Sequence, residues 1–443
     1  MPITLNHVSP QGALLTRSLE KSHAWLERAK KVVPGCAQTF SKSPQLFVQN
    51  VAPNFLARAD GAFVWDVDGN RYIDWINGLG PIVLGHCNPA VDEAVRMQLK
   101  RGISFSLPAT LEVELSEQLC ELVPCAEMVR FGKNGSDVTS AAVRVARAVT
   151  GRDKVACCGY HGWQDWYIGS TSRFLGVPDA VRRLTVPFPY NDLDALSSLF
   201  QEHKGQIACV IIEPLTFDLP QAGYLEGVKT LCQRNGALLV FDEIVTGFRV
   251  ALGGAQEYFA VTPDLACFGK GMANGYPLSA IVGRAEIMSK FTEVFFSFTH
   301  GGEALSLAAG LATIHEMVQK DVTGHFWRVG NQLKERTNRI ISECGLQGHC
   351  SCVGAAPWTT IRFHDAEGRD WPVLRSLFQQ EALKRGLLTH GNHMLSYSHD
   401  ESLIEETLAI YQAVFTLLAQ AIARKDVGQR LEGPPMEGVF RSR

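Results

Sequence analysis

The sequence predicts an α/β domain with a mostly parallel sheet, accompanied by a smaller α+β domain. From about residue 130 to 285, short apolar runs typical of buried strands alternate with amphipathic helical patterns. After about residue 315, amphipathic helices flank a weaker β-like stretch at 359–363. We therefore predict a large domain at 76–314 and a small domain at 315–443, with the N-terminal segment 1–75 packing on the small domain.

The composition is that of an ordinary globular protein. The 443 residues are 46% hydrophobic and 20% charged, with a net charge of -3, which gives no electrostatic case for binding nucleic acid or an anionic membrane. We see no secretory signal at the start and no uninterrupted apolar run of 18 residues, so no transmembrane helix is expected. Twelve scattered cysteines, mostly in apolar segments, favour reduced thiols and a cytoplasmic location.

The N-terminal segment contains a predicted β-hairpin. Residues 62–65 and 71–75 read as its two strands, and Asp66-Val67-Asp68-Gly69-Asn70 supplies the turn. At the other end, Gly433-Pro434-Pro435 is expected to be loose.

The predicted strands of the large domain are apolar runs of four to six residues. They lie at 155–158, 207–212, 237–241, 265–268 and 279–282. Helices are predicted at 138–148 and at 225–234, the second ending at Asn235-Gly236. In the C-terminal part, helices are predicted around 381–388 and at 402–423.

A lysine and an aspartate each follow one of these strands. Lys270 stands between two glycines after the run 265–268, and Asp242 ends the run 237–241. In a parallel sheet both positions fall at the carboxyl edge, where ligands bind. A lysine that forms a Schiff base and a carboxylate that charges a pyridine ring are what pyridoxal phosphate (PLP) chemistry requires. A solvated loop lysine is the alternative interpretation.

A second set of residues is suited to holding such a cofactor. Gly135 and Ser136 open the helix at 138–148, where backbone N–H groups can bind a phosphate, and Ser136 can cap the helix. Tyr160 and His161 follow the strand at 155–158, so an aromatic ring could stack on the cofactor. Ile244 lies on the same side as Asp242 and could press on the other face. A capped helix without a ligand and a core aromatic beside a satisfied histidine remain the alternatives.

No metal site is expected. The cluster His349-Cys350-Ser351-Cys352, with Cys344 nearby, lacks the second ligand pair that zinc needs.

The motifs, in this order, resemble the class III (omega-type) aminotransferases of PLP fold type I, closest to the branch with glutamate-1-semialdehyde 2,1-aminomutase. The resemblance runs from about residue 33 to 417. The motifs that carry it are Asp66-Val67-Asp68-Gly69-Asn70-Arg71-Tyr72-Ile73-Asp74, Leu84-Gly85-His86, Tyr160-His161-Gly162, Glu213-Pro214, Asp242-Glu243-Ile244-Val245-Thr246-Gly247-Phe248-Arg249 and Phe268-Gly269-Lys270-Gly271.

The resemblance implies a role for each matching residue. Lys270 would form the internal aldimine, and Asp242 would pair with the pyridinium nitrogen. Gly135 and Ser136 would hold the phosphate, and Tyr160 would stack on the ring. Thr299 matches the family threonine that reaches the phosphate of the neighbouring subunit, which implies a homodimer with shared active sites.

Three positions depart from the aminomutase pattern. Lys42 stands where the aminomutase has an arginine for the substrate carboxylate, and a lysine cannot form that forked contact. Asp218 replaces an asparagine near the cofactor hydroxyl and is assigned no firm role. His390-Gly391-Asn392-His393 replaces a stretch that contains a glutamate.

These departures favour an intermolecular aminotransferase, which moves an amino group from an amino donor to a carbonyl acceptor. The loop with Trp163 and Trp166 is bulkier than a small-substrate lid needs, and Lys42, Trp163 and Glu213 are the candidate substrate residues. The alternatives are glutamate-1-semialdehyde 2,1-aminomutase, another PLP isomerase or racemase on this fold, and a catalytically silent relative. The intact Lys270 and Asp242 argue against silence.

Overall fold

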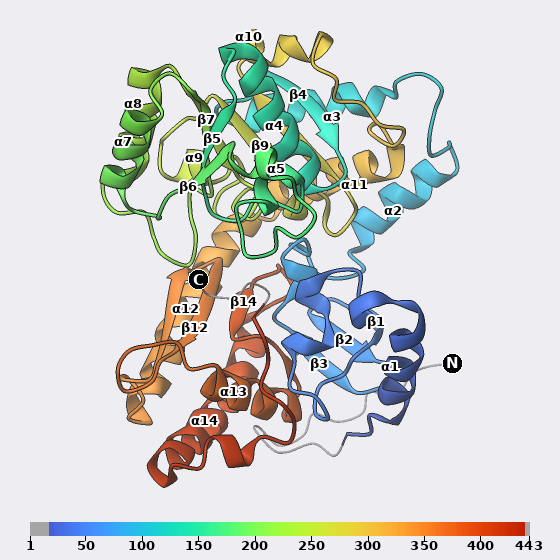
Figure 1. The fold of residues 1–443 in the computed structure, drawn as a ribbon. Helices are drawn as coiled ribbons and strands as arrows, with labels where there is room; N and C mark the ends of the chain where they lie inside the picture. The colour runs from blue at the N-terminus through green and yellow to red at the C-terminus, as the bar shows by residue number, and fades with distance from the viewer. Residues whose placement is uncertain (1–16, 439–443) are drawn as a thin grey trace. The chain divides into compact units, whose positions relative to one another are not determined.

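The computed structural model describes residues 17–438 and divides them into two compact units (Figure 1). Unit 1 contains residues 17–79, 85–87 and 325–438. Unit 2 contains residues 80–84 and 88–324. Unit 2 is therefore one nearly continuous stretch, whereas unit 1 is assembled from segments that lie far apart in the sequence.

Unit 2 is built on a seven-stranded sheet with the order β4-β10-β9-β8-β7-β5-β6. Its strands are β4 (Met128–Gly132), β5 (Lys154–Cys158), β6 (Thr185–Pro187), β7 (Ile207–Ile212), β8 (Leu238–Asp242), β9 (Leu265–Phe268) and β10 (Ser279–Gly283). Strands β6, β5, β7, β8 and β9 pair in parallel, and β10 is antiparallel to both β9 and β4. The predicted mostly parallel α/β sheet is confirmed.

Both faces of this sheet are covered. Helix α4 (Gly135–Thr150) packs on one face, where Val138 and Val145 meet alternate strand residues such as Ile211 and Val240. The intervening residues, Val210 among them, point to the other face and are buried as well. Continuous apolar runs are what a parallel strand with two covered faces requires.

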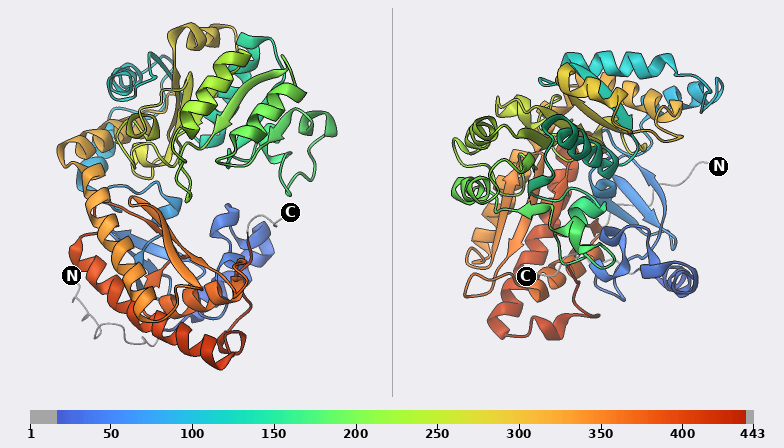
Figure 2. Two further views of the ribbon diagram at one scale, coloured as in Figure 1. Left: turned by 90° about the vertical axis from the view of Figure 1, so that its left-hand side faces the viewer. Right: turned by 45° about the horizontal axis from the view of Figure 1, so that its top comes forward.

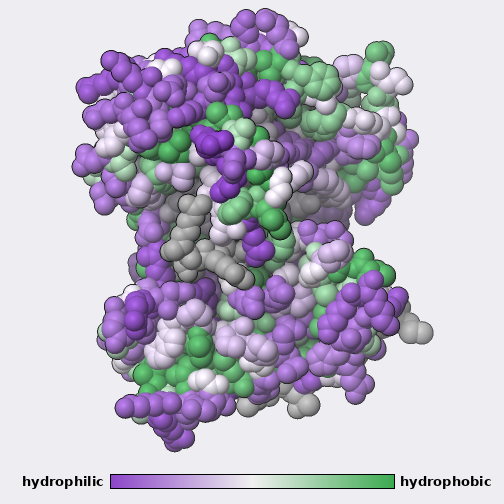
Figure 3. Space-filling model, in the orientation of Figure 1, coloured by the Kyte–Doolittle hydropathy of each residue, from purple (hydrophilic) through white to green (hydrophobic). Residues whose placement is uncertain are grey.

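The remaining helices of unit 2 surround this sheet (Figure 2). They are α2 (Pro89–Leu99), α3 (Thr110–Leu122), α5 (Asp165–Ile168), α6 (Asp179–Arg182), α7 (Leu193–Glu202), α8 (Tyr224–Asn235), α9 (Ala255–Tyr258), α10 (Ala285–Met288) and α11 (Ala304–Gln319). Helix α8 ends as predicted, because Gly236 adopts the left-handed conformation that stops a helix. The outward face of α7 and α8 is hydrophilic in Figure 3.

All five predicted strands of unit 2 are present, each within one residue at either end. Two further strands, β4 and β6, were not predicted. In β4 half-buried positions alternate with exposed ones and only Gly132 is buried, and β6 has only three residues, so neither forms the apolar run that marks the others.

Unit 1 begins with helix α1 (Glu20–Val32) and a four-stranded sheet of order β1-β2-β3-β13. Strands β1 (Leu56–Asp60), β2 (Phe63–Asp66) and β3 (Arg71–Asp74) are antiparallel neighbours, which confirms the predicted hairpin. The carboxylate of Asp66 closes its turn by accepting the N–H groups of Asp68 and Asn70 at 3.0 and 2.8 Å. Gly69, at φ 93°, supplies the positive backbone angle.

The C-terminal part of unit 1 adds a three-stranded antiparallel sheet of order β11-β12-β14 and three helices. The strands are β11 (Cys350–Ala355), β12 (Trp358–Phe363) and β14 (Asn392–Met394), and the helices are α12 (Val322–Glu343), α13 (Pro372–Lys384) and α14 (Glu401–Arg424).

The prediction that a helix continues to residue 388 is wrong. Helix α13 ends at Lys384, and Gly386 takes φ 94°, a left-handed angle that turns the chain. Strand β13 (Leu387–Leu388) then pairs in parallel with β3. The predicted domain limit at 314/315 falls inside α11. Unit 2 continues beyond this helix, to residue 324.

Among the described residues, one helix is long and apolar enough to cross a membrane by length and composition alone. This is α14, and 44% of its most apolar window is buried in the structure. The rings of Tyr411 and Phe415 pack on Phe378 of α13, so α14 is packed as a core helix of unit 1.

Candidate active site

Four neighbouring parallel strands of unit 2 carry the candidate residues at one edge of the sheet. Asp242 is the last residue of β8, Lys270 follows β9 after Gly269, Glu213 directly follows β7, and His161 comes soon after β5. Because β9, β8, β7 and β5 are adjacent and parallel, these carboxyl ends share an edge, the position where such sheets bind ligands.

The Asp242 carboxylate is held by two donors. Its Oδ2 accepts the Nδ1–H of His161 at 2.8 Å, and its Oδ1 accepts the backbone N–H of Ile244 at 3.1 Å. Asp242 is 4% exposed and His161 1% exposed. The pair fixes the carboxylate and places the histidine proton on Nδ1, because the carboxylate can only accept.

Lys270 begins a short 3₁₀ helix, Lys270–Ala273, with φ at 40°. A residue with a side chain adopts this left-handed angle at a cost of about 1–3 kcal/mol, and such angles gather at functional sites. Burial lowers the pKa of its ammonium group, and the charge of Arg249 acts in the same direction, whereas Glu213 and Asp242 oppose the shift. A lowered pKa increases the share of free amine, the form that attacks a carbonyl.

The predicted phosphate turn lies at the start of α4. Asn134 occupies the N-cap position, and its N–H donates to Oδ2 of Asp137 at 2.7 Å. The prediction that Ser136 caps the helix is therefore wrong, because Ser136 lies inside the first turn, after Gly135. Gly135 and Ser136 both lie in the first turn of the helix, where backbone N–H groups have no acceptor within the helix and can bind a phosphate.

Glycines bring this turn close to its neighbours. A Cβ on Gly162 would lie 2.6 Å from the Cβ of Ser136, and Gly162 has φ 107°. A Cβ on Gly135 or Gly269 would lie 3.0 or 3.1 Å from Cδ1 of Ile244. Ile244 therefore lies against both the turn and the glycine that precedes Lys270. Gly162 belongs to the motif Tyr160-His161-Gly162, but the sequence predicts no role for it at the phosphate turn.

Tyr160 and Glu213 are linked through the main chain. The N–H of Tyr160 donates to Oε2 of Glu213 at 2.8 Å. The Tyr160 side chain is 52% exposed, and its ring stands edge-on to Tyr167 with centroids 5.6 Å apart. The ring is therefore about half exposed at this edge of the sheet, the position from which an aromatic ring can stack on a cofactor.

The two tryptophans that follow behave differently. Trp163 is 65% exposed and stays a candidate for substrate contact. Trp166 is buried, donates its Nε1–H to Oγ of Ser140 at 3.0 Å and lies nearly parallel to the His161 ring. Trp166 is thus a core residue and not part of a lid.

The other predicted residues lie on other segments of the chain. Lys42 belongs to unit 1, where it is exposed and lines a cavity of about 570 Å³ together with Cys36, Arg58, Asp74 and His86. Asp218 is exposed in unit 2. Gly391 lies in unit 1 at φ 93°, where a Cβ would meet Phe363 and Ile361 at 3.5 Å or more.

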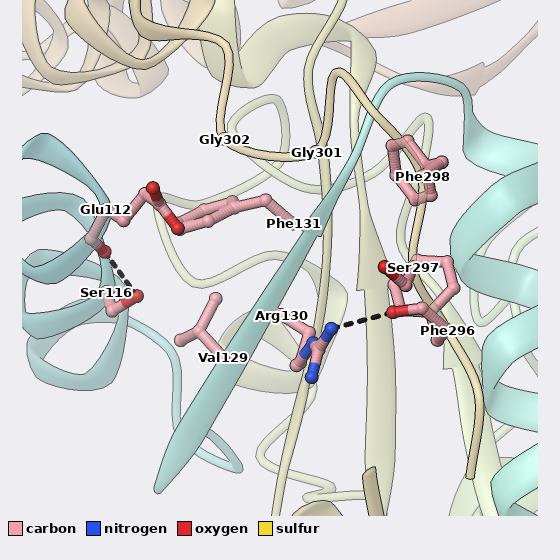
Figure 4. A pocket seen from close by; sticks show the side chains of 10 residues that line it. All are labelled: Glu112, Ser116, Val129, Arg130, Phe131, Phe296, Ser297, Phe298, Gly301 and Gly302. Atoms are coloured by element: carbon pink, nitrogen blue, oxygen red, sulfur yellow. Dashed lines mark hydrogen bonds between the residues drawn. The ribbon is translucent and has the colours of Figure 1, made fainter. Parts of the chain in front are cut away.

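Thr299 is exposed in a turn of unit 2. The segment around it forms one wall of a pocket of about 410 Å³, shown in Figure 4. In this pocket Arg130 of β4 donates to the backbone oxygen of Phe296 at 2.7 Å, which ties the segment to the edge of the sheet. The other lining residues are Glu112, Ser116, Val129, Phe131, Ser297, Phe298, Gly301 and Gly302.

The residues present fit PLP. Gly162 packs closely against Ser136, so the residues around the start of α4 are small. The N-terminus of a helix favours binding of a phosphate. Asp242 is a fixed, buried carboxylate that can pair with a pyridine nitrogen, and Lys270 supplies a primary amine. Within residues 17–438 no cluster of three His, Cys, Asp or Glu side chains is arranged to hold a metal ion.

Comparison with known proteins agrees with this assignment. The family Aminotransferase class-III matches residues 47–355, more than half of the chain. The chain is 38% identical to the glutamate-1-semialdehyde 2,1-aminomutase of Syntrophobacter fumaroxidans over 360 residues, which is 77% of this chain and 80% of that protein. It is 34% identical to the aminomutase of Natronomonas pharaonis, covering 89% of this chain and 99% of that protein.

A solved structure shows the same fold. The FumI protein of a Sphingopyxis species, in its PLP internal aldimine form, superposes with a TM-score of 0.85 at 29% identity, covering 94% of this chain and 99% of that one. The predicted PLP fold type I and the resemblance to the aminomutase-like branch are thereby confirmed. The chain belongs to the class III aminotransferases, enzymes that work with PLP.

Proposed function

We propose that this enzyme holds PLP on Lys270 and exchanges an amino group within one substrate, as a glutamate-1-semialdehyde 2,1-aminomutase does. The observation that carries this choice is the identity of 34–38% to two curated aminomutases over most of the chain. It reverses the preference that the sequence alone gave for intermolecular transfer.

The residues of unit 2 support amino-group chemistry of either kind. PLP, when bound, supplies an electron sink for the pair released at the substrate Cα. Asp242 is held by His161 and Ile244, so its charge is fixed where a pyridine nitrogen would need a partner. The start of α4 at Gly135 and Ser136 is the proposed phosphate site. Tyr160 offers a half-exposed aromatic ring for stacking.

Lys270 has two proposed tasks, and both need its Nζ as a free amine. It attaches the cofactor, and after substrate takes its place it carries a proton between Cα and the cofactor. Burial lowers the pKa of this amine, which favours the unprotonated form for the first task. A positioned acid–base group of this kind contributes roughly 10²–10⁴-fold to a rate.

Intermolecular transfer from an amino donor to a carbonyl acceptor is the second candidate, and residues of unit 1 favour it. Lys42 is exposed on a cavity wall where the resemblance implies an arginine for the aminomutase substrate. Gly391 stands in a stretch where the aminomutase has a glutamate. A site that lacks a forked carboxylate contact and a charge binds that substrate less well.

One experiment separates the two candidates. The purified enzyme is incubated with glutamate-1-semialdehyde and no added acceptor. Rapid formation of 5-aminolevulinate supports the aminomutase. If instead an amino donor converts the cofactor to its amine form and the reaction then stops until a carbonyl compound is added, the enzyme is an intermolecular aminotransferase. Failure of both in a PLP-loaded protein would contradict the proposed function.

We also propose a homodimer in which Thr299 serves the phosphate site of the partner. Thr299 is exposed, and the unit that carries it has exposed apolar residues on α2, α3 and the loop between them. Green residues gather over this loop in the upper right of Figure 3. The most exposed is Leu107 at 79%. Such a patch is typical of a protein interface.

We place the enzyme in the cytoplasm. All twelve cysteines lie among the described residues and are free thiols, and most are buried, with the pKa of several raised by burial. Buried, unpaired thiols are typical of a reducing compartment.

A further inference from the structure

Glu213 lies between two elements of the proposed PLP site, and the mechanism above gives it no task. It follows the last residue of β7, Ile212, whose partners across the sheet are Cys158 on β5 and Phe241 on β8. The residues that follow these three partners are Gly159 after Cys158, Glu213 after Ile212 and Asp242 after Phe241. Glu213 thus stands in register between the strand end that leads to Tyr160 and the strand end that carries Asp242.

The carboxyl group is held on the Tyr160 side. Its Oε2 accepts the N–H of Tyr160 at 2.8 Å, and the N–H of Glu213 donates to the backbone oxygen of Cys158 at 3.1 Å. A Cβ on Gly159 would lie 2.5 Å from the same Oε2, and Gly159 has φ 112°. The strand end is thus shaped so that the Glu213 carboxyl can reach the main chain of Tyr160.

Three charged or titratable groups act on Glu213 from neighbouring strand ends. Burial and the negative charge of Asp242 raise its pKa to about 7, while His161 and Lys270 act against this shift. The same coupling acts on the lysine, because Glu213 is the carboxyl that most strongly opposes the lowering of the Lys270 pKa. The charge of Glu213 also contributes to the raised pKa values of four further neighbours, Cys158, Tyr160, Tyr167 and Tyr190.

We propose that Glu213 is a positioning residue of the Lys270 site, which anchors the Tyr160 main chain and, through its negative charge, controls how readily Lys270 gives up its proton. The proposal rests on the proposed function, since it concerns the same lysine. It assigns no substrate contact to Glu213, in contrast to the expectation from sequence. The reason is geometric: the carboxyl is already bound to the N–H of Tyr160 and lies beside Asp242.

The charge can be removed with little change of shape. In Glu213→Gln the amide oxygen can still accept the Tyr160 N–H, whereas the negative charge is lost. Glu226→Gln is the matched control, because Glu226 is an exposed carboxylate in the first turn of α8 in the same unit. Both variants lose one charge, and only the first loses it at the edge of the sheet that carries Lys270.

The readout is the protonation of Lys270 in the apoenzyme. Trace acetylation over a range of pH, followed by peptide mass spectrometry, gives the pH at which Lys270 becomes half reactive. We expect Glu213→Gln to lower this midpoint by about half a pH unit or more, a threefold gain in reactivity, because a carboxylate that stabilises the ammonium is gone. Glu226→Gln should leave the midpoint where it is. An unchanged midpoint in folded Glu213→Gln would overturn the proposal.

A reciprocal variant keeps the test decisive if Glu213→Gln does not fold. Coupling between two groups is mutual, so Lys270→Gln should raise the pH at which Glu213 loses its proton. The thermal midpoint of the apoenzyme should then decline at higher pH than in the wild type. If the pH range over which the thermal midpoint declines is the same in Lys270→Gln and in the wild type, Glu213 and Lys270 are not coupled and the proposal fails.

The outcomes also separate this inference from the proposed function. The acetylation uses neither PLP nor substrate. If PLP attaches to Lys270 and the midpoint does not respond to Glu213→Gln, only the role of Glu213 is lost. If the midpoint responds and PLP does not attach to Lys270, the proposed function is lost and the coupling stands.

Discussion

His161 and Asp242 are joined by a 2.8 Å hydrogen bond although they follow strands that do not touch. Strand β7 lies between β5 and β8, and the loop after β5 crosses its end to bring the histidine to the carboxylate. The histidine binds Oδ2 of Asp242, and the N–H of Ile244 binds the other oxygen, Oδ1. The position of the acid that would charge the pyridine nitrogen thus depends on three strands at once.

The first prediction concerns the attachment of the cofactor. Borohydride reduction of the PLP-loaded enzyme followed by peptide mapping should place the pyridoxyl group on Lys270. Lys270→Ala should lower turnover by at least about 10³-fold, because both the attachment point and the proton carrier are removed. A label on another lysine would disprove the assignment.

The second prediction concerns Asp242. Asp242→Asn should reduce turnover by about 10²–10³-fold, because a neutral amide cannot stabilise a charged ring nitrogen. The thermal midpoint should change far less than the rate. Turnover close to that of the wild type would show that another group protonates the ring.

The third prediction uses two glycines of opposite surroundings. Gly162→Ala places a Cβ 2.6 Å from the Ser136 Cβ, whereas Gly151→Ala, at the other end of α4, meets nothing within 4 Å. Both positions have positive φ, so both variants bear backbone strain of about 1 kcal/mol or more. Only Gly162→Ala should displace the phosphate turn, and we expect its PLP affinity to fall by about tenfold or more. Equal PLP affinity in the two variants would contradict the turn assignment.

The fourth prediction tests the shared site. Lys270→Ala chains are mixed with Thr299→Glu chains under conditions of proven subunit exchange. If Thr299 serves the partner, each mixed dimer has one intact site, and about a quarter of wild-type activity should return at equal amounts. No recovery would show that Thr299 serves its own chain, and full activity of the Thr299→Glu chains alone would show that it serves neither site.

The fifth prediction concerns pH and stability. Burial raises the pKa of Glu213 to about 7, well above the ordinary carboxyl range. The folded protein therefore holds this proton more tightly than the unfolded chain, and the contribution to stability is lost as the pH rises through about 7. The thermal midpoint of the apoenzyme should fall between about pH 5 and pH 7, and that of Glu213→Gln should fall less over the same interval. A steeper fall in the variant would reverse the sign of this argument.

The parallel sheet could be predicted because its strands are continuous apolar runs that end in polar residues. Asp242 and Lys270 stood out for the same reason. The sequence does not reveal that β7 lies between β5 and β8, so the bond from His161 to Asp242 could not be derived from it. Strand order depends on how the whole sheet packs, and no local pattern records it.

Other errors have local causes. Leu387 and Leu388 continue the apolar spacing of α13, and only the positive φ of Gly386 separates them from the helix. Trp166 was grouped with Trp163 because only two residues separate them, whereas Trp166 lies in helix α5 and its indole N–H donates to Ser140 inside unit 2. Ser136 is a good cap by residue type, but Asp137 closes the turn onto Asn134 instead.

The pairing of β13 with β3 has a consequence for synthesis of the protein. Leu387 and Ile73 are partners in one sheet although more than three hundred residues separate them. Strand β13 can therefore pair with the N-terminal hairpin only after most of the chain has been synthesised. Unit 2 is complete once residue 324 has been made. On the ribosome, we therefore expect the large sheet to form first, while the N-terminal strands stay exposed as an open edge until translation is nearly finished.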